Sequence, residues 1–383
     1  MHHPRATLFA AIAALALSQL GGTAWAGAVV GPPSPSYQTN GRVETIAISG
    51  TTAYIGGKFT AVRPPGAAPG SRAVARAHAA AIDLTTGALL PWNPAPSGTV
   101  QTIAVDGHTV ILGGSFTRLG TRNAGRLVAV TGTTGAELWR AKPNGQVNDV
   151  VIRDGVVAVG GAFTSVGNAP RSYLASVNER TGALQSDWNA TTDAPVTALA
   201  LTPDESTIIV GGTFDSLDGV GVHRLGSVSA TDGALTDWRP QFPPSVVSLG
   251  VDQNGVFVGG IGDGGNFASF DVDTGATRWL GGTDGNVQAI TLYDGVVYVG
   301  GHYENYCGAA PGTHLCPTPT PRSKALAIGS LTGLLQPWHP VVNSVLGIFA
   351  LAGGSGYLAV GGDFTRIGGR QQQGFAIFPV QLT

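Results

Sequence analysis

The sequence predicts an all-β fold, a seven-bladed β-propeller with four-stranded antiparallel blades. A Gly-Gly pair at the end of a short apolar run marks each of seven repeat units: 56–57, 113–114, 160–161, 211–212, 259–260, 300–301 and 361–362. A Trp precedes each of the last six pairs by 21 or 23 residues: Trp92, Trp139, Trp188, Trp238, Trp279 and Trp338. A period of roughly 40–50 residues of strand-like sequence is typical of propellers.

The second unit shows the four expected strands. Residues 100–105 alternate and are β-branched, and Asp106-Gly107 then suits a tight hairpin turn. Residues 109–114 form the second strand, residues 127–130 the third, and the fourth ends at Trp139. Short strands with two apolar faces need sheets packed on both sides, which a ring of blades provides.

The glycines and tryptophans both have structural interpretations. Paired glycines permit a close backbone approach that other residues resist. A Trp at a fixed offset is expected to bury its ring against the neighbouring blade, with its indole N–H seeking an acceptor. Because the period accounts for every Trp after residue 26, we favour packing over ligand stacking.

Residues 1–26 are expected to be a signal peptide. Arg5 supplies a positive charge, residues 8–17 are apolar, and Ala24-Trp25-Ala26 fits a cleavage site. The apolar run is too short to span a membrane, and no later stretch is long enough. We therefore expect a secreted protein, extracellular or periplasmic, in which residues 27–383 form a single domain.

The two ends of the chain are expected to meet. Six units have a fourth strand, whereas no Trp strand follows the third strand of the seventh unit at residues 375–378. The simplest closure pairs the N-terminal segment near residues 29–36 with that strand, as the outer strand of the last blade. This closure would remove an open sheet edge.

Two long loops locate the favoured binding face. They connect the second and third strands of the first unit (residues 60–76) and of the sixth unit (residues 302–324). The sixth, seventh and first units are consecutive in a closed ring, so both loops are expected on one side of one face. Loops on a rigid scaffold commonly carry binding residues.

The sixth loop carries the only two cysteines, Cys307 and Cys316, which in an exported protein predict a disulfide. The residues around it could form a recognition loop: His302, Glu304, Tyr306 and His314. A metal site of His302, Glu304 and His314 is the weaker interpretation, because this spacing is unlike true zinc motifs. A third interpretation is a Pro-rich loop that the disulfide only stiffens. We expect no bound metal.

Arginines face this loop from the neighbouring units: Arg63 and Arg72 in the first unit and Arg366 in the seventh. They would suit a glycan, an acidic polymer or a peptide. An Arg also recurs shortly before the third strand of most units: Arg76, Arg126, Arg171, Arg224, Arg322 and Arg370. Because these arginines recur, we expect them to hydrogen-bond loop carbonyls in each unit and not to bind a ligand at one site.

The inner strands offer a second candidate site. The residue after each opening Val could ring the channel mouth: Glu44, Gln101, Asn148, Thr197, Val247, Gln288 and Leu346. Asp149 is the neighbouring acid. Such polar groups could bind sugar hydroxyls or simply face water.

No catalytic motif is present: the sequence has no Gly-x-Ser-x-Gly elbow, His-Glu-x-x-His helix or phosphate loop. Paired carboxylates need only proximity in space, and Glu44, Asp149 and Glu304 are the candidates. A lyase would use His302 or His78 with Tyr306. The alternative function is therefore an extracellular polysaccharide hydrolase or lyase at the channel mouth.

The repeat Gly-Gly-x-Phe-Thr followed by Thr-Gly-Ala-Leu-x-x-Trp resembles the delta-60-type β-propeller repeats of secreted bacterial proteins, over residues 42–380. It is also similar to the propeller of fungal cortical polarity markers. A second resemblance, in residues 81–92, is to quinoprotein-type repeats. That family's cofactor site usually uses eight blades and often adjacent cysteines, whereas this chain has seven units and cysteines nine apart, so we expect no cofactor.

These observations favour a binding or scaffold module for a glycan or protein ligand, which we expect to be monomeric. The formal net charge of −2 argues against a nucleic-acid partner, which needs a basic face.

Overall fold

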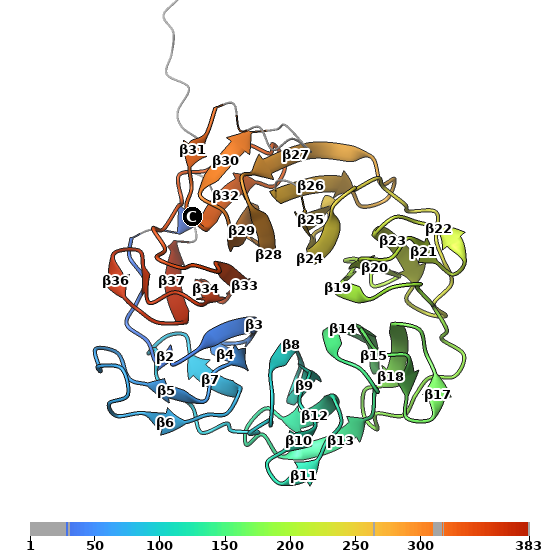
Figure 1. Ribbon diagram of the computed structural model, residues 1–383, viewed down its shortest axis with the longest axis horizontal. Coiled ribbons are helices and arrows are strands. Elements are labelled where there is room, and N and C mark those ends of the chain that lie inside the picture. The colour runs from blue at the N-terminus through green and yellow to red at the C-terminus, as the bar shows by residue number, and fades with distance from the viewer. Residues whose placement is uncertain (1–27, 30, 263–264, 309–315, 317, 382–383) are drawn as a thin grey trace, which may run out of the picture.

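The chain folds into sheets that stand radially around a central channel, the arrangement of a β-propeller (Figure 1). The computed structural model describes residues 28–29, 31–262, 265–308, 316 and 318–381. Every regular element among them is a strand, in agreement with the predicted all-β class. None of these residues forms a helix long and apolar enough to cross a membrane.

The first strand of each unit lines the channel, and each inner strand packs on the inner strands of the two adjacent units, so that the first and last also meet. The inner strands are β3 (Arg42–Ser49), β8 (Val100–Asp106), β14 (Val147–Arg153), β19 (Val196–Leu201), β24 (Ser245–Val251), β28 (Asn286–Tyr293) and β33 (Ile348–Gly354).

Two further strands follow in every unit and pair antiparallel in order. The second strands are β4 (Thr52–Lys58), β9 (Thr109–Gly114), β15 (Val156–Gly161), β20 (Thr207–Gly212), β25 (Gly255–Ile261), β29 (Val296–His302) and β34 (Tyr357–Gly362). The third strands are β7 (Ala79–Asp83), β12 (Leu127–Thr131), β18 (Leu174–Asn178), β23 (Leu225–Ser229), β26 (Gly265–Asp271), β32 (Ala325–Gly329) and β37 (Phe375–Gln381).

The outermost position varies among the units. Full strands occupy it in the second, fifth and seventh units: β13 (Glu137–Ala141), β27 (Thr277–Thr283) and β1 (Ala28–Val29). In the other units it is reduced to one isolated bridge, such as Ile82 with Leu89. The first unit's outer segment is anchored by its buried Trp92 more than by ladder hydrogen bonds.

Short strands fill the long connections on what we call the loop face, the end of the ring where the second strand leads to the third. They are β2 (Gln38–Thr39), β5 (Ala61–Arg63), β6 (Val74–Ala75), β10 (Arg118–Leu119), β11 (Arg122–Asn123), β16 (Ser165–Val166), β17 (Ala169–Pro170), β21 (Ser216–Leu217), β22 (Val220–Gly221), β30 (Asn305–Gly308), β31 (Thr320–Pro321), β35 (Arg366–Ile367) and β36 (Arg370–Gln371). The opposite end, where first and second strands turn, is the hairpin face.

The N-terminal segment closes the last sheet, as the sequence predicted. Strand β1 pairs antiparallel with β37, with Ala28 opposite Gln381 and Val29 opposite Val380. Ser34 adds a bridge to Ile377 in the same sheet. The edge of the C-terminal sheet is therefore covered by the chain's own beginning.

The glycine pairs lie where neighbouring units touch. A β-bulge interrupts each inner strand after its opening Val or Ile, opposite the pair. A Cβ added to Gly113 would lie 2.6 Å from Val147 Cγ1 of the next unit, and one on Gly361 would lie 2.6 Å from Val43 Cγ1. The first glycine of each pair therefore makes room for the next unit's opening residue.

The tryptophans bridge successive units as expected. Trp92 Nε1 donates to the Thr131 carbonyl of the next unit at 3.0 Å, and Trp279 Nε1 to the Ser330 carbonyl at 2.9 Å. Trp139 and Trp238 make the equivalent bonds. The indole nitrogens of Trp188 and Trp338 have no partner among the described residues.

We expect Gly113→Ala to lower the free energy of unfolding by about 1–3 kcal/mol, because the new methyl group meets Val147 in a packed seam. Gly221→Ala is the matched control, since a Cβ at that position meets nothing within 4 Å. Urea unfolding of the two variants measures the difference. Equal stability would show that the glycine pair does not depend on this contact.

Candidate functional site

The bulge residues of the inner strands surround a cavity of about 300 Å³ in the channel. Six residues of the predicted ring line it: Glu44, Gln101, Asn148, Thr197, Val247 and Gln288. The prediction of Leu346 as the seventh member is wrong. Ile348 pairs with Gly362, so the bulge residue there is Phe349, because the preceding connection is longer than in the other units.

Most polar members of this ring bond the neighbouring unit. Asn148 Nδ2 donates to the Val196 carbonyl at 2.7 Å, and Thr197 Oγ1 donates to the Val246 carbonyl. With its amide oriented so that the nitrogen faces these acceptors, Gln288 donates to the Leu346 carbonyl at 3.0 Å and to the Ile348 carbonyl at 3.2 Å. These side chains hold adjacent inner strands together, which leaves them little capacity for a ligand.

Glu44 is held by Arg42, whose guanidinium donates to Glu44 Oε1 at 2.7 Å and also lies 4.1 Å above the Phe349 ring. Gln101 differs, since its Oε1 is buried with no donor among the described residues. Of these two side chains, the Glu44 carboxylate is therefore already paired and the Gln101 amide oxygen is not.

Asp149 connects three units. Thr102 Oγ1 donates to its Oδ1 at 2.9 Å, and the Leu199 N–H donates to its Oδ2 at 2.8 Å. Burial raises the pKa of Asp149 to about 6, against the lowering effect of these hydrogen bonds and of one from the Val150 N–H. The Asp149 carboxyl group therefore links the inner strands of three units.

The sixth loop lies on the fifth unit. Cys307 and Cys316 form the predicted disulfide, with an S–S distance of 2.06 Å. Strand β30 pairs with β27, placing Tyr306 opposite Thr283, and the Tyr306 ring lies 6.3 Å from that of Phe267. Tyr306 is half-buried in this contact. The loop thus extends the fifth sheet, and no hydrogen bond among the described residues links it to the first or seventh loop.

Glu304 is also engaged. Lys324, which is 4 % exposed, donates from Nζ to Glu304 Oε1 at 2.6 Å, and this hydrogen bond lowers the pKa of Glu304. His302 is exposed, and His314 lies outside the described residues. No group of three or more metal-binding side chains occurs within the described ranges.

Arg63 is a structural residue. It is buried, and its guanidinium donates to the Ala67 carbonyl at 3.1 Å, to Gln38 Oε1 at 3.1 Å and to Gln373 Oε1 at 2.8 Å. Burial lowers its pKa. Arg63 therefore ties the N-terminal segment, the first loop and the seventh unit together. Arg72 and Arg366 are exposed.

Five of the six recurring arginines bond loop carbonyls, as their recurrence predicted, and Arg370 makes no such bond among the described residues. Arg76 and Arg171 donate to the carbonyl of the residue before them and to a carbonyl of the outer segment, Leu90 and Gln185 respectively. Arg126 and Arg224 donate to a carbonyl of the connection that follows, and Arg322 to Pro321. They stabilise loops in several units.

The fifth unit breaks the repeat. Strand β25 ends at Ile261 and β26 begins at Gly265, so no loop hairpin fits between them. The missing Phe of the repeat is replaced by Phe242 from the preceding connection. A Cβ added to Gly260 would lie 2.8 Å from the Phe242 ring, as one on Gly212 would lie 2.9 Å from Phe214. The sequence shows that this Phe is missing but does not reveal that Phe242 takes its place.

The missing hairpin leaves a groove, a cavity of about 760 Å³. Apolar side chains dominate its lining: Phe242, Pro243, Pro244, Ile261, Phe267 and Leu280. Arg224, Gln241, Ser245, Asn266 and Thr277 provide polar groups there. Its volume lies within the range of sites that bind ligands, roughly 300–1,000 Å³.

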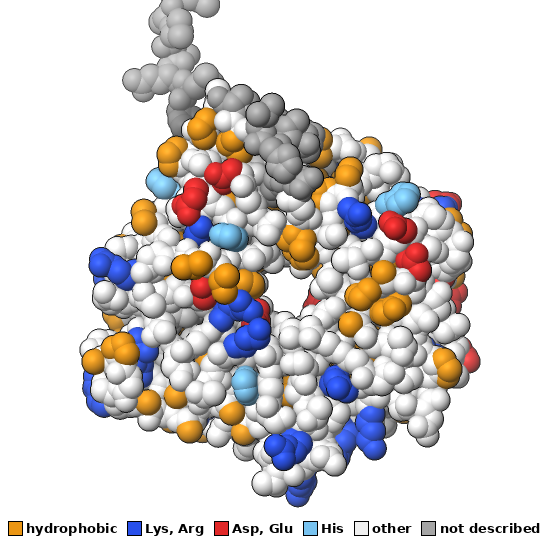
Figure 2. Space-filling view, in the orientation of Figure 1, with side chains coloured by type: hydrophobic (Ala, Val, Ile, Leu, Met, Phe, Trp, Pro, Cys, Tyr) orange, Lys and Arg blue, Asp and Glu red, His pale blue; other side chains and the backbone are white. Residues whose placement is uncertain are grey.

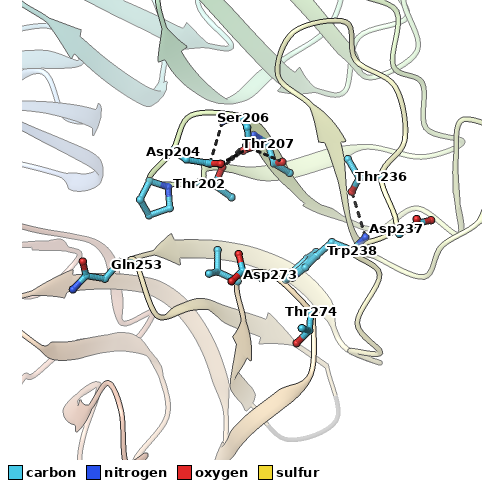
Figure 3. A pocket seen from close by; sticks show the side chains of 12 residues that line it. Thr202, Asp204, Ser206, Thr207, Thr236, Asp237, Trp238, Gln253, Asp273 and Thr274 are labelled. Atoms are coloured by element: carbon cyan, nitrogen blue, oxygen red, sulfur yellow. Dashed lines mark hydrogen bonds between the residues drawn. The ribbon is translucent and has the colours of Figure 1, made fainter.

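A second cavity, of about 550 Å³, lies on the hairpin face between the fourth and fifth units (Figure 3). Its wall includes Asp204, Asp237, Asp273 and Trp238. The hydroxyl groups of Thr202 and Ser206 donate to Asp204 and lower its pKa to about 2. Asp204 thus shapes its own turn, and Asp237 pairs with Arg239 at 2.9 Å.

The sequence model of one protein family, described as outer membrane protein assembly factor BamB, matches residues 75–240, less than half of the chain. No curated protein sequence matches significantly. Among solved structures, the WD40 β-propeller domain of Doa1 is 12% identical with a TM-score of 0.58, covering 91% of this chain and 97% of that one. The computationally designed Ika8 protein is 14% identical with a TM-score of 0.54, covering 91% and 100%. Together they show a β-propeller with quinoprotein-type repeats.

Asp149 should make stability depend on pH. Its pKa is raised by folding from 3.8 to about 6, so the folded state holds the proton more tightly than the unfolded state. The stabilisation is fully present below pH 3.8 and is lost as the pH rises through about 6. The free energy of unfolding falls over this range by at most about 3 kcal/mol. Asp149→Asn cannot ionise and should flatten this decline, which urea unfolding between these pH values measures. Equal slopes in the two proteins would refute the assignment.

Arg63→Ala should lower the free energy of unfolding by about 2–3 kcal/mol, because it leaves Gln38 and Gln373 without their buried donor. Arg72→Ala, an exposed change in the same loop, should shift it by less than about 0.5 kcal/mol. Thermal melting compares the two. If Arg63→Ala is as stable as Arg72→Ala, Arg63 is free to serve a ligand.

Proposed function

We propose that this chain is a non-enzymatic binding or scaffold module of the cell envelope or the extracellular space. Its ligand is an extended segment of another protein, held in the groove of the fifth unit. One observation carries this proposal: the groove opens where the repeat loses its hairpin and Phe242 repairs the core beneath it. The packing of Phe242 completes the core of the fifth unit, whereas the open groove above it adds nothing to the stability of the fold.

The groove offers both parts of a peptide site. Phe242, Pro244 and Leu280 provide apolar surface for side chains. Strand β27, which carries Leu280, pairs on its outer side only through Gly282 and Thr283 among the described residues. The remaining edge can accept main-chain hydrogen bonds from an added strand.

A protein ligand suits this mixed lining. Pro243, Pro244, Ile261 and Leu280 offer apolar contacts to side chains, and the polar residues of the lining offer hydrogen bonds to a peptide main chain. The matched family is described as an assembly factor for outer membrane proteins, which agrees with a protein partner.

The finer architecture belongs to the same proposal: seven blades of four antiparallel strands, in a single domain over residues 27–383, with repeats of the delta-60 type. The cycle of contacts among the inner strands supports the blade count. Residues 1–26 act as the export signal, and the disulfide agrees with an oxidising compartment. We propose that the mature protein is a monomer.

Peptides selected from a random phage-displayed library on the wild-type protein test the groove. Leu280→Asp should weaken their binding by at least about tenfold in fluorescence anisotropy, because it places a charge in the apolar lining. Leu138→Asp is the matched control, since Leu138 is an exposed leucine on the outer strand β13.

Gln241→Trp provides an independent test, because the bulky ring fills the groove from an exposed position without removing core atoms. It should also weaken binding. Selected peptides that bind both groove variants as tightly as wild type, or a failure to select any peptide, would overturn the proposal.

A further inference from the structure

The two faces of the ring carry opposite charge, although the net charge of the chain is only −2. On the hairpin face, an Asp stands in or beside the inner turn of five consecutive units: Asp106, Asp154, Asp204, Asp252 and Asp294. Asp232 and Asp273 add to them from the turns after the third strands, whereas Glu179 is buried. Arg153 and Arg180 lie beside these turns, and the acidic side chains outnumber them, so this face is acidic.

The loop face is basic. Arg118 and Arg122 are exposed on β10 and β11, and Arg366 and Arg370 are exposed on β35 and β36. Figure 2 looks onto this face and shows Lys and Arg side chains beside the channel mouth and over the outer loops, with fewer acidic ones. The recurring arginines bond carbonyl oxygens and therefore keep their charge.

An apolar patch lies on the same face, in the connection that leads to β33. Val341 is 72 % exposed, Val345 77 % and Leu346 44 %. The connection is held in place, because the N–H of Arg366 donates to Asn343 Oδ1 at 2.6 Å and the N–H of Gly368 to the Val341 carbonyl at 3.0 Å. The patch and Arg366 therefore move together.

Two carboxylates lie near the patch. Asp363 accepts the N–H groups of Leu346 and Gly347, each at 3.1 Å, and keeps its charge, whereas Glu44 is paired with Arg42. The exposed guanidinium groups of Arg366 and Arg370 therefore outnumber the unpaired carboxylate of Asp363.

We propose that the loop face, at the sixth-to-seventh connection, docks on the surface of an anionic lipid bilayer. Val341, Val345 and Leu346 enter the interface, and Arg366 and Arg370 meet the anionic headgroups. The acidic hairpin face is repelled and points away, so one orientation is favoured. Exposed valine and leucine side chains gain by entering a bilayer, whereas a soluble acidic polymer offers them nothing.

Co-sedimentation with lipid vesicles tests the proposal on the mature chain. We expect binding to vesicles of phosphatidylcholine mixed with phosphatidylglycerol, and little binding to phosphatidylcholine alone. Salt at roughly 0.5 M should weaken it, because surface charges are then screened within a few ångströms. Val345→Asp with Leu346→Asp should reduce partitioning by at least about tenfold, and Arg366→Glu with Arg370→Glu similarly.

Leu331→Asp with Leu334→Asp is the matched control, since both leucines are 62 % exposed in the turn after the third strand β32, on the acidic hairpin face. This variant should bind as wild type does. Leu280→Asp should also bind normally, which separates this proposal from the groove. Equal binding to both vesicle types, no binding, or an equal loss in the control variant would overturn it. A loss confined to the arginine variant would do so too, and would indicate an acidic polymer.

Discussion

Contact between the glycine pair of one unit and the opening Val or Ile of the next is the constraint on which the ring depends. Gly56 lies against Val100, and the same contact recurs around the ring until Gly361 lies against Val43. Each contact lets two sheets approach to a spacing that any Cβ would widen. Because the contacts form a closed cycle, widening at one seam must be taken up at the others. This explains why the pair is retained in all seven units, including the fifth, where other features of the repeat are lost.

The polar residues of the channel follow from the same geometry. A bulge at each inner strand turns one side chain toward the channel and leaves main-chain groups that the strand ladder does not pair. Asn148 and Thr197 bond the next unit's carbonyl, and Asp149 and Ser248 accept its amide. Asn148, Thr197 and Asp149, which resemble a sugar site in the sequence, are therefore bonded to neighbouring strands. Burial raises the pKa of Asp149, whereas its hydrogen bonds lower it.

Repetition made much of the fold predictable. The strand order, the packing of Trp92 and its equivalents and the pairing of the N-terminal segment with the last sheet all follow from comparing one unit with the next. The disulfide was predicted separately, because the chain has only two cysteines. Contacts that occur once could not be found this way. Arg63 donates to Gln373, which is 310 residues away in the sequence. Phe242 takes the place of the Phe that follows the glycine pair in other units, and β30 pairs with the sheet of the neighbouring unit. The difference in charge between the two faces was not predicted. Acidic and basic residues are interspersed along the sequence and give a small net charge, and they separate only when each strand end is assigned to its face of the ring.

Departures from the repeat therefore carry the functional argument. A residue that recurs from unit to unit is explained by the ring, as the arginines bonded to loop carbonyls show. The fifth unit omits its hairpin although six other units keep one, and its core is completed by Phe242 at no evident gain in packing. Exposed Val345 and Leu346 likewise sit in the one connection that is longer than its equivalents and bury nothing. Surface features that stability does not require are the ones whose retention a ligand or a membrane would explain.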